Sequence, residues 1–137
     1  MTEHQDQASF FYEISLRLRN RDDFVPELFF ATMNGAWFGG NGARMYEARK
    51  REGFKKGVAD ILYLQPRGKF SYLAIELKTE KRYKEKNRGV EPNQEIFLDA
   101  VRKNGGRALV CYGAEEAVDA MLEYMDECHH TPARRFR

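Results

Sequence analysis

Two apolar segments of this chain each contain one acidic residue. Asp60 lies within residues 57–64 (GVADILYL), and Glu76 lies within residues 72–78 (YLAIELK), where Lys78 follows two positions later. Segments that are apolar on both faces are typical of central strands, where an uncompensated carboxylate is costly. A divalent cation could compensate two such acids, and a neighbouring lysine could counter the charge of a phosphate. These residue types therefore indicate metal-dependent hydrolysis of a phosphodiester.

The spacing of the two segments predicts how these residues meet. The segments are symmetric about Gly68, so a hairpin that turns at residues 66–68 sets Asp60 roughly opposite Glu76. Because side chains alternate along a strand, Glu76 and Lys78 project from one face. Two plainer interpretations remain open: Asp60 as a hydrogen-bonded turn acid, and Glu76 with Lys78 as a salt bridge on an exposed strand. The apolar neighbours of Glu76 argue against exposure.

The elements that must position these residues follow from periodicity and turn signals. Residues 3–19 predict a helix with an apolar stripe, and residues 92–103 predict another with Ile96, Phe97, Ala100 and Val101 as its apolar positions. The other expected elements are a strand at 28–33, a short basic helix at 43–52, a loop at 79–89, a strand at 107–112 and a helix at 114–127. The order predicts an α/β fold.

Length and composition limit the class of protein. With 137 residues, 42% hydrophobic and 32% charged, the chain predicts one globular domain over residues 1–128 and a loose basic tail over 129–137. No apolar run is long enough to span a bilayer and no signal peptide is evident, so we expect no membrane partner and a cytoplasmic location, in a bacterial host or for a phage-encoded protein. The two cysteines, Cys111 and Cys128, lack CxxC spacing, and His129 and His130 lack a fourth metal ligand, so we expect no thiolate metal site.

Basic residues cluster on either side of the acidic strand pair. Residues 44–56 and 78–88 together hold twelve bases and four acids, a net +8 in a chain whose net charge is +2. Such a surface suits a polyanion whose phosphate must reach a metal, although two solvated charged segments remain the plain alternative. The candidate DNA-binding residues are Arg44, Arg49, Lys50, Lys55, Lys56, Lys81, Arg82 and Lys84. Trp37 and Phe38, in a glycine-rich loop, could stack on unpaired bases or serve as a core flap or dimer contact.

These residues together resemble a known family. Asp60, fifteen intervening residues and then Glu76-Leu77-Lys78 resemble the PD-(D/E)xK nuclease signature. The wider series is similar to the VRR-NUC branch, including its small stand-alone phage and bacterial members, over about residues 3–124. That series comprises Arg49, Gly53, the run KGVADI at 56–61, Gln94, Phe97-Leu98 and Gly105-Gly106. Ala59 departs from the proline that many relatives carry before the aspartate.

The resemblance implies a fold and residue roles. It implies a restriction-endonuclease-like core (αβββαβ) with a mixed central sheet flanked by helices. Asp60 and Glu76 would ligate Mg²⁺ or Mn²⁺ together with the backbone carbonyl of Leu77, Lys78 would orient the attacking water, and Gln94 would support the site. The family also uses a glutamate of the first helix, for which Glu3 fits better than Glu13, and both stay open.

The function that the resemblance implies is a structure-dependent DNA endonuclease. Small relatives look like Holliday-junction resolvases that act as homodimers on branched DNA. One alternative is a non-catalytic nucleic-acid-binding module with a vestigial metal site. A second alternative is a less selective flap or single-strand nuclease. A third is a small-molecule hydrolase, but that function would leave the flanking positive charge unexplained.

Overall fold

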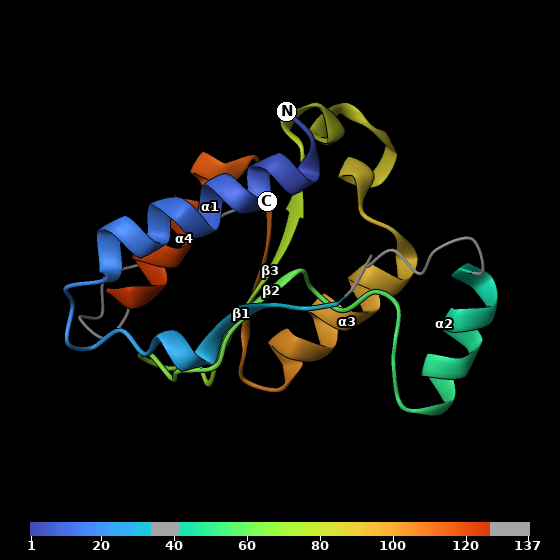
Figure 1. Ribbon diagram of the computed structural model, residues 1–137, viewed down its shortest axis with the longest axis horizontal. Coiled ribbons are helices and arrows are strands. Elements are labelled where there is room, and N and C mark those ends of the chain that lie inside the picture. Colours follow the sequence, from blue (N-terminus) through green and yellow to red (C-terminus); the bar gives the residue numbers. More distant parts are fainter. Residues whose placement is uncertain (34–41, 127–137) are drawn as a thin grey trace.

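The computed structural model describes residues 1–33 and 42–126 (Figure 1). Its elements are α1 (Glu3–Leu18), the 3₁₀ helix η1 (Pro26–Leu28), β1 (Phe29–Ala31), α2 (Gly42–Arg51), β2 (Ile61–Tyr63), β3 (Leu73–Lys78), the 3₁₀ helices η3 (Glu80–Lys84) and η4 (Lys86–Gly89), α3 (Pro92–Lys103), β4 (Arg107–Tyr112) and α4 (Ala114–Met125). Within these residues no helix is long and apolar enough to cross a bilayer.

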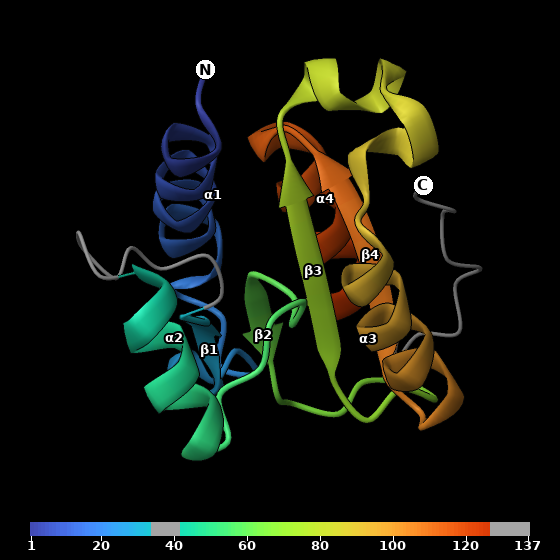
Figure 2. The same cartoon turned by 90° about the vertical axis from the view of Figure 1, so that its right-hand side faces the viewer.

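The four strands form one mixed sheet in the order β1-β2-β3-β4. Strands β1, β2 and β3 pair antiparallel, whereas β3 and β4 pair parallel. A parallel pair needs a crossover connection, and α3 lies in the chain between β3 and β4 to supply it, as Figure 2 shows. The prediction of an α/β fold with a mixed sheet and flanking helices is confirmed.

The side chains of β3 alternate between two helical layers. Leu73, Ile75 and Leu77 join the larger apolar core, which α1 and α4 close from one face of the sheet (Figure 1). Ala74 points to the opposite face, where it meets Leu98 and Val101 of α3 and apolar residues of β4. By the same alternation, Glu76 and Lys78 lie on the α3 side, beyond the apolar part of that layer. All six residues of β3 are buried, as expected for a central strand.

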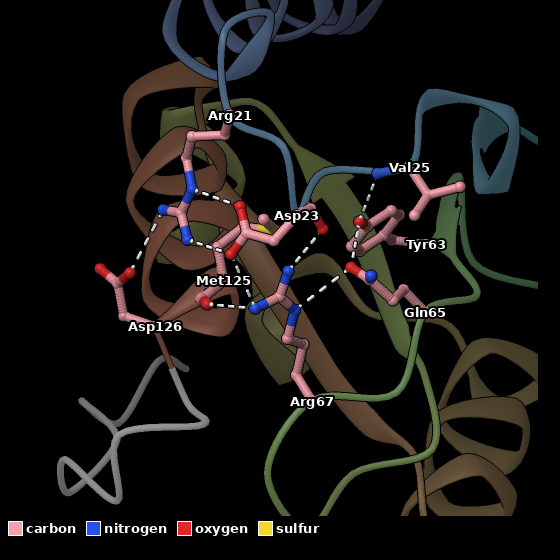
Figure 3. A network of polar contacts seen from close by, with 8 residues as sticks. All are labelled: Arg21, Asp23, Val25, Tyr63, Gln65, Arg67, Met125 and Asp126. Atoms are coloured by element: carbon pink, nitrogen blue, oxygen red, sulfur yellow. Dashed lines mark hydrogen bonds and ion pairs between the residues drawn. The ribbon is translucent and has the colours of Figure 1, made fainter.

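A network around Arg67 fixes the connection between β2 and β3 (Figure 3). Arg67 is 8% exposed, and its guanidinium donates to the backbone carbonyls of Asp23 at 2.6 Å and Met125 at 3.1 Å. It also forms an ion pair with the Asp23 carboxylate at 3.1 Å. Arg21, which binds both carboxylate oxygens of Asp23, holds the pKa of that acid well below its usual range. The network ties the segment after α1 and the end of α4 to the connection that sets the β2–β3 register.

The stretch 79–89 is not a plain loop: backbone hydrogen bonds such as Arg82 N–H to Thr79 C=O, at 3.0 Å, form η3 and η4. Such short turns depend on local hydrogen bonds and have no apolar period that could reveal them.

Trp37, Phe38, Cys128, His129, His130 and the expected tail at 129–137 lie outside the described residues.

Candidate active site

Asp60 and Glu76 come together through the pairing of β2 with β3. Ile61, the first residue of β2, lies opposite Ile75 of β3. The same register sets Asp60, the residue before Ile61, opposite Glu76, the residue after Ile75. The opposition predicted from the symmetry about Gly68 is therefore confirmed. The two carboxyl groups lie close enough for the charge of Asp60 to raise the pKa of Glu76.

Asp60 is held in place by three neighbouring backbone and side-chain groups. The residue is 7% exposed, and Oδ2 accepts a hydrogen bond from the backbone N–H of Leu77 at 2.7 Å. Its backbone carbonyl accepts from the N–H of Thr32 at 2.8 Å, and the Thr32 hydroxyl donates to the carbonyl of Ala59 at 2.7 Å. Burial raises the pKa of Asp60, while the Leu77 hydrogen bond opposes that rise. The acid is thus anchored to both β3 and the end of β1.

Glu76 is almost inaccessible to solvent, with 1% of the residue exposed. Its Oε2 lies 3.7 Å from Lys78 Nζ and accepts a hydrogen bond from Gln94 Nε2 at 3.3 Å. Burial raises the pKa of Glu76 to about 9, the charge of Asp60 and the hydrogen bond with it add to the rise, and Lys78 opposes it. The fold therefore holds this acid where its ionised form is disfavoured.

Gln94 reaches Glu76 from the first turn of α3. Its Oε1 accepts a hydrogen bond from the backbone N–H of Glu91 at 2.9 Å, as part of a capping box. Because a backbone donor occupies the amide oxygen, the amide nitrogen is directed at Glu76. Pro92 at the start of the helix sets the backbone for this turn. Gln94 is therefore a positioning residue whose direction is fixed by the helix start.

The donor atoms present fit a hard divalent cation. Glu76 Oε1 is buried and has no hydrogen-bond partner among residues 1–33 and 42–126, and two carboxylates face only one buried ammonium, that of Lys78. No group of three His, Cys, Asp or Glu side chains in these residues is placed to hold a metal, so a third ligand would be backbone or water. The backbone N–H of Leu77 points to Asp60. The N–H and C=O of one strand residue face the same side, so the carbonyl of Leu77 faces the side of Asp60 as well. Mg²⁺ commonly keeps several waters beside one or two carboxylates.

The sequence and the fold both have relatives. The profile of the VRR-NUC domain matches residues 36–115, more than half of the chain. The chain belongs to the VRR-NUC family. This is a family of nucleases, as the resemblance predicted, and the matched VRR-NUC span contains Asp60, Glu76, Lys78 and Gln94.

A solved structure described as a VRR_NUC domain protein has the same fold. It superposes with a TM-score of 0.70 at 19% identity, over 92% of this chain and 89% of that one. The likeness extends beyond the profile match, since it covers 92% of this chain whereas the profile covers residues 36–115. A search of curated proteins finds no match.

The two candidate acids of α1 lie in different surroundings in this VRR-NUC chain. Glu3, at the helix start, is half-buried, and its pKa is raised by burial and by the charge of Asp60 and lowered by Lys78. Glu13 instead lies 3.5 Å from Arg17 on the exposed side of the helix. The structure brings Glu3, and not Glu13, into the electrostatic field of the site.

The eight candidate DNA-binding residues lie on α2 and the segment after it, and on η3. Figure 2 shows α2 to one side of β3 and η3 beyond its C-terminal end, the end of the strand that carries Glu76 and Lys78. Arg82 is half-buried and binds Glu85 at 2.6 Å and the Gly89 carbonyl at 3.1 Å, and Arg49 pairs with Glu52 at 2.8 Å. The other six are exposed, and none of them forms an ion pair with another residue of the described ranges. Lysines therefore make up most of the available positive charge.

Gly57 contributes to the site in a way that the sequence analysis did not recognise. Its φ is +88°, and a Cβ added there would lie 2.6 Å from the carbonyl oxygen of Asn93, at the start of α3. Only glycine permits this approach without strain. The contact joins the residues before Asp60 to the turn that carries Gln94. The glycine before the aspartate formed part of the family resemblance, but its contact with α3 has no local signature.

Proposed function

We propose that this protein is a metal-dependent, structure-dependent DNA endonuclease that hydrolyses phosphodiester bonds at the Asp60–Glu76–Lys78 site. The observation that carries the proposal is the buried pair of acids, in which Glu76 Oε1 has no hydrogen-bond partner among the residues that the structure describes. A purely structural pair of acids has no reason to remain this costly, because apolar residues would fill the same space more favourably.

The proposal gives each residue of the site a role. Asp60, Glu76 and the carbonyl of Leu77 would hold Mg²⁺ or Mn²⁺, and Glu3 would contribute through its negative charge. The ion supplies Lewis acidity and a more acidic water for attack on phosphorus. Lys78 donates hydrogen bonds to the phosphate and offsets the negative charge that grows on its oxygens while the P–O bond breaks. Gln94 keeps Glu76 in its orientation.

The proposed substrate is branched DNA, bound mainly through phosphates by the lysines and arginines that flank β3. A homodimer would place two such sites about a two-fold axis and nick two strands of a four-way junction symmetrically. The cytoplasmic location expected from the sequence belongs to the same proposal. A less selective flap or single-strand nuclease remains the alternative for this site.

A cleavage panel tests the proposal. Labelled four-way junctions, flaps, plain duplexes and single strands of related sequence are incubated with the purified protein in Mg²⁺, in Mn²⁺ or in EDTA. We expect metal-dependent cutting that favours the junction, with symmetric nicks. Sedimentation of the protein alone and with the junction measures the oligomeric state.

Variants assign the chemistry to the site. Asp60→Asn and Glu76→Gln should abolish cutting while circular dichroism shows the native fold, and Glu13→Gln is the matched control because Glu13 lies away from the site. Cutting by Glu76→Gln at the wild-type rate would refute the site assignment. Equal cutting of all four substrates would refute junction specificity alone. DNA binding without any cleavage would favour a vestigial site.

A further inference from the structure

A groove of about 660 Å³ lies between α2, the segment 53–58 and α3. Figure 2 looks onto both helices. Its volume falls within the range of roughly 300–1,000 Å³ that is usual for small-ligand sites. Tyr46, Phe54 and Ile96 are among the apolar side chains that line it. The cleavage chemistry described above uses none of these residues.

The apolar wall of the groove is a second stripe on α3. Leu98 and Val101 face the sheet and are buried. Ile96, Phe97 and Ala100, together with Asn93, follow the spacing of a helix face and line the groove instead. Ile96 is 71% exposed. The helix therefore presents a large apolar residue that the described fold does not cover.

The charged side chains of the groove are all positive. Lys50, Lys55 and Lys56 line it, and no acidic residue does. Lys56 Nζ lies 4.8 Å from the centre of the Tyr46 ring, and Tyr46 and Phe54 pack edge to face with centroids 6.3 Å apart. Apolar and aromatic surface beside several cations suits a flat, apolar group attached to a phosphate chain.

The groove adjoins the candidate active site. Val58 lines the groove and precedes Asp60 by two residues, while Asn93 lines it and precedes Gln94 by one. The contact of Gly57 with the Asn93 carbonyl joins these two edges. A strand whose phosphate lies at Asp60 and Glu76 therefore has the groove beside it.

We propose that this groove binds an unpaired nucleotide of the DNA substrate next to the phosphate that is cut. The base would stack against Ile96 and the aromatic wall, and Lys50, Lys55 and Lys56 would contact the adjoining phosphates. In a paired duplex each base is stacked between its neighbours, so its face is not available for this contact. The inference rests on the proposed DNA substrate, and it gives a physical basis for a preference for branched over continuous duplexes.

Fluorescence anisotropy in EDTA measures this binding without hydrolysis. The probes are three labelled duplexes of one sequence: fully paired, with one unpaired thymidine, and with an abasic nucleotide at the unpaired position. The wild-type protein should bind the unpaired thymidine about tenfold more tightly than the abasic probe. Ile96→Ser should remove that difference. Lys55→Ala should weaken all three probes and reduce the slope of log affinity against log salt by about 1.

Matched controls separate the groove from general surface effects. Leu16→Ser removes an exposed apolar residue of α1, and Lys69→Ala removes a lysine of the β2–β3 connection, and neither should alter the thymidine preference. Equal affinity of the wild type for the thymidine and abasic probes would overturn the inference, as would an unchanged preference in Ile96→Ser. Loss of dimerisation in Ile96→Ser with an unchanged preference would assign the groove to a second copy of the chain. Cleavage in Mg²⁺ is scored separately: cutting without base preference refutes only the groove, and base preference without cutting refutes only the nuclease.

Discussion

Glu76→Gln should stabilise the protein in the absence of metal while abolishing its activity. Gln keeps the shape of the side chain and can still accept the hydrogen bond from Gln94, but it stays neutral at every pH and needs no proton on folding. The buried Asp60–Lys78 pair that remains is neutral in sum. The change therefore removes the cost of protonating Glu76 on folding at neutral pH, a cost that arises because burial disfavours its ionised form.

The size of the effect follows from the pKa of Glu76. The folded-state pKa of about 9 lies above the ordinary 4.5, so the folded state retains a proton that the unfolded state has released. Stability is greatest below the ordinary pKa and falls as the pH rises towards 9, because the unfolded state then binds fewer protons than the folded state. At pH 7 the difference is worth about 3 kcal/mol, at about 1.4 kcal/mol for each pH unit.

Urea unfolding between pH 5 and pH 9 measures this prediction. We expect the unfolding midpoint of Glu76→Gln to exceed that of the wild type by roughly 1 M or more at pH 7, and the gap to narrow towards pH 5. Saturating Mg²⁺ should then stabilise the wild type, by about 2.7 kcal/mol at 100 times the dissociation constant, and leave Glu76→Gln unchanged. Glu13→Gln, at an exposed site, should lie within about 0.5 kcal/mol of the wild type throughout. A variant no more stable than the wild type at pH 7–9 would refute the reasoning.

Three further changes test the supports of the site. Gly57→Ala should reduce the cleavage rate about 10- to 100-fold, because the added Cβ would displace Asn93. Gly53 also has a positive φ, but no atom lies within 4 Å of an added Cβ, so Gly53→Ala should keep a rate within a few-fold of the wild type. Single-turnover cleavage compares the two variants. Gln94→Ala should weaken metal binding about 10- to 100-fold, as measured by Mn²⁺ titration calorimetry, and wild-type affinity would show that it does not position Glu76. Arg67→Ala should cost about 2–3 kcal/mol in urea unfolding because two backbone carbonyls lose their donor, and a loss below 0.5 kcal/mol would contradict the structural role of the Arg67 network.

The sequence predicts most of the fold because its elements have clear local signals. The apolar period of α1 and α3, the proline that starts α3 and the glycines after it are read directly from neighbouring residues. The opposition of Asp60 and Glu76 was also predictable, since a hairpin fixes its own register once the turn is placed. These signals lie within short stretches of chain.

The remaining features depend on partners that are distant in the sequence. Nothing near Arg67 indicates that it is buried against the carbonyl of Met125, 58 residues away. The apolar residues of α3 did not reveal that Leu98 and Val101 face the sheet while Ile96 faces the groove, because the helix has two apolar stripes and the sequence does not say which is covered. The choice between Glu3 and Glu13 likewise needed the position of the start of α1 relative to Asp60.

The alternation of β3 explains why this site tolerates little change in register. Leu73, Ile75 and Leu77 build the core with α1 and α4. Glu76 and Lys78 alternate with them along the strand and therefore lie on the opposite face. A slip of one residue would exchange these faces, placing the charges in the apolar core and leucine at the site. Stability and chemistry therefore demand the same register, and the Arg67 network, which holds the β2–β3 connection from outside the sheet, serves both.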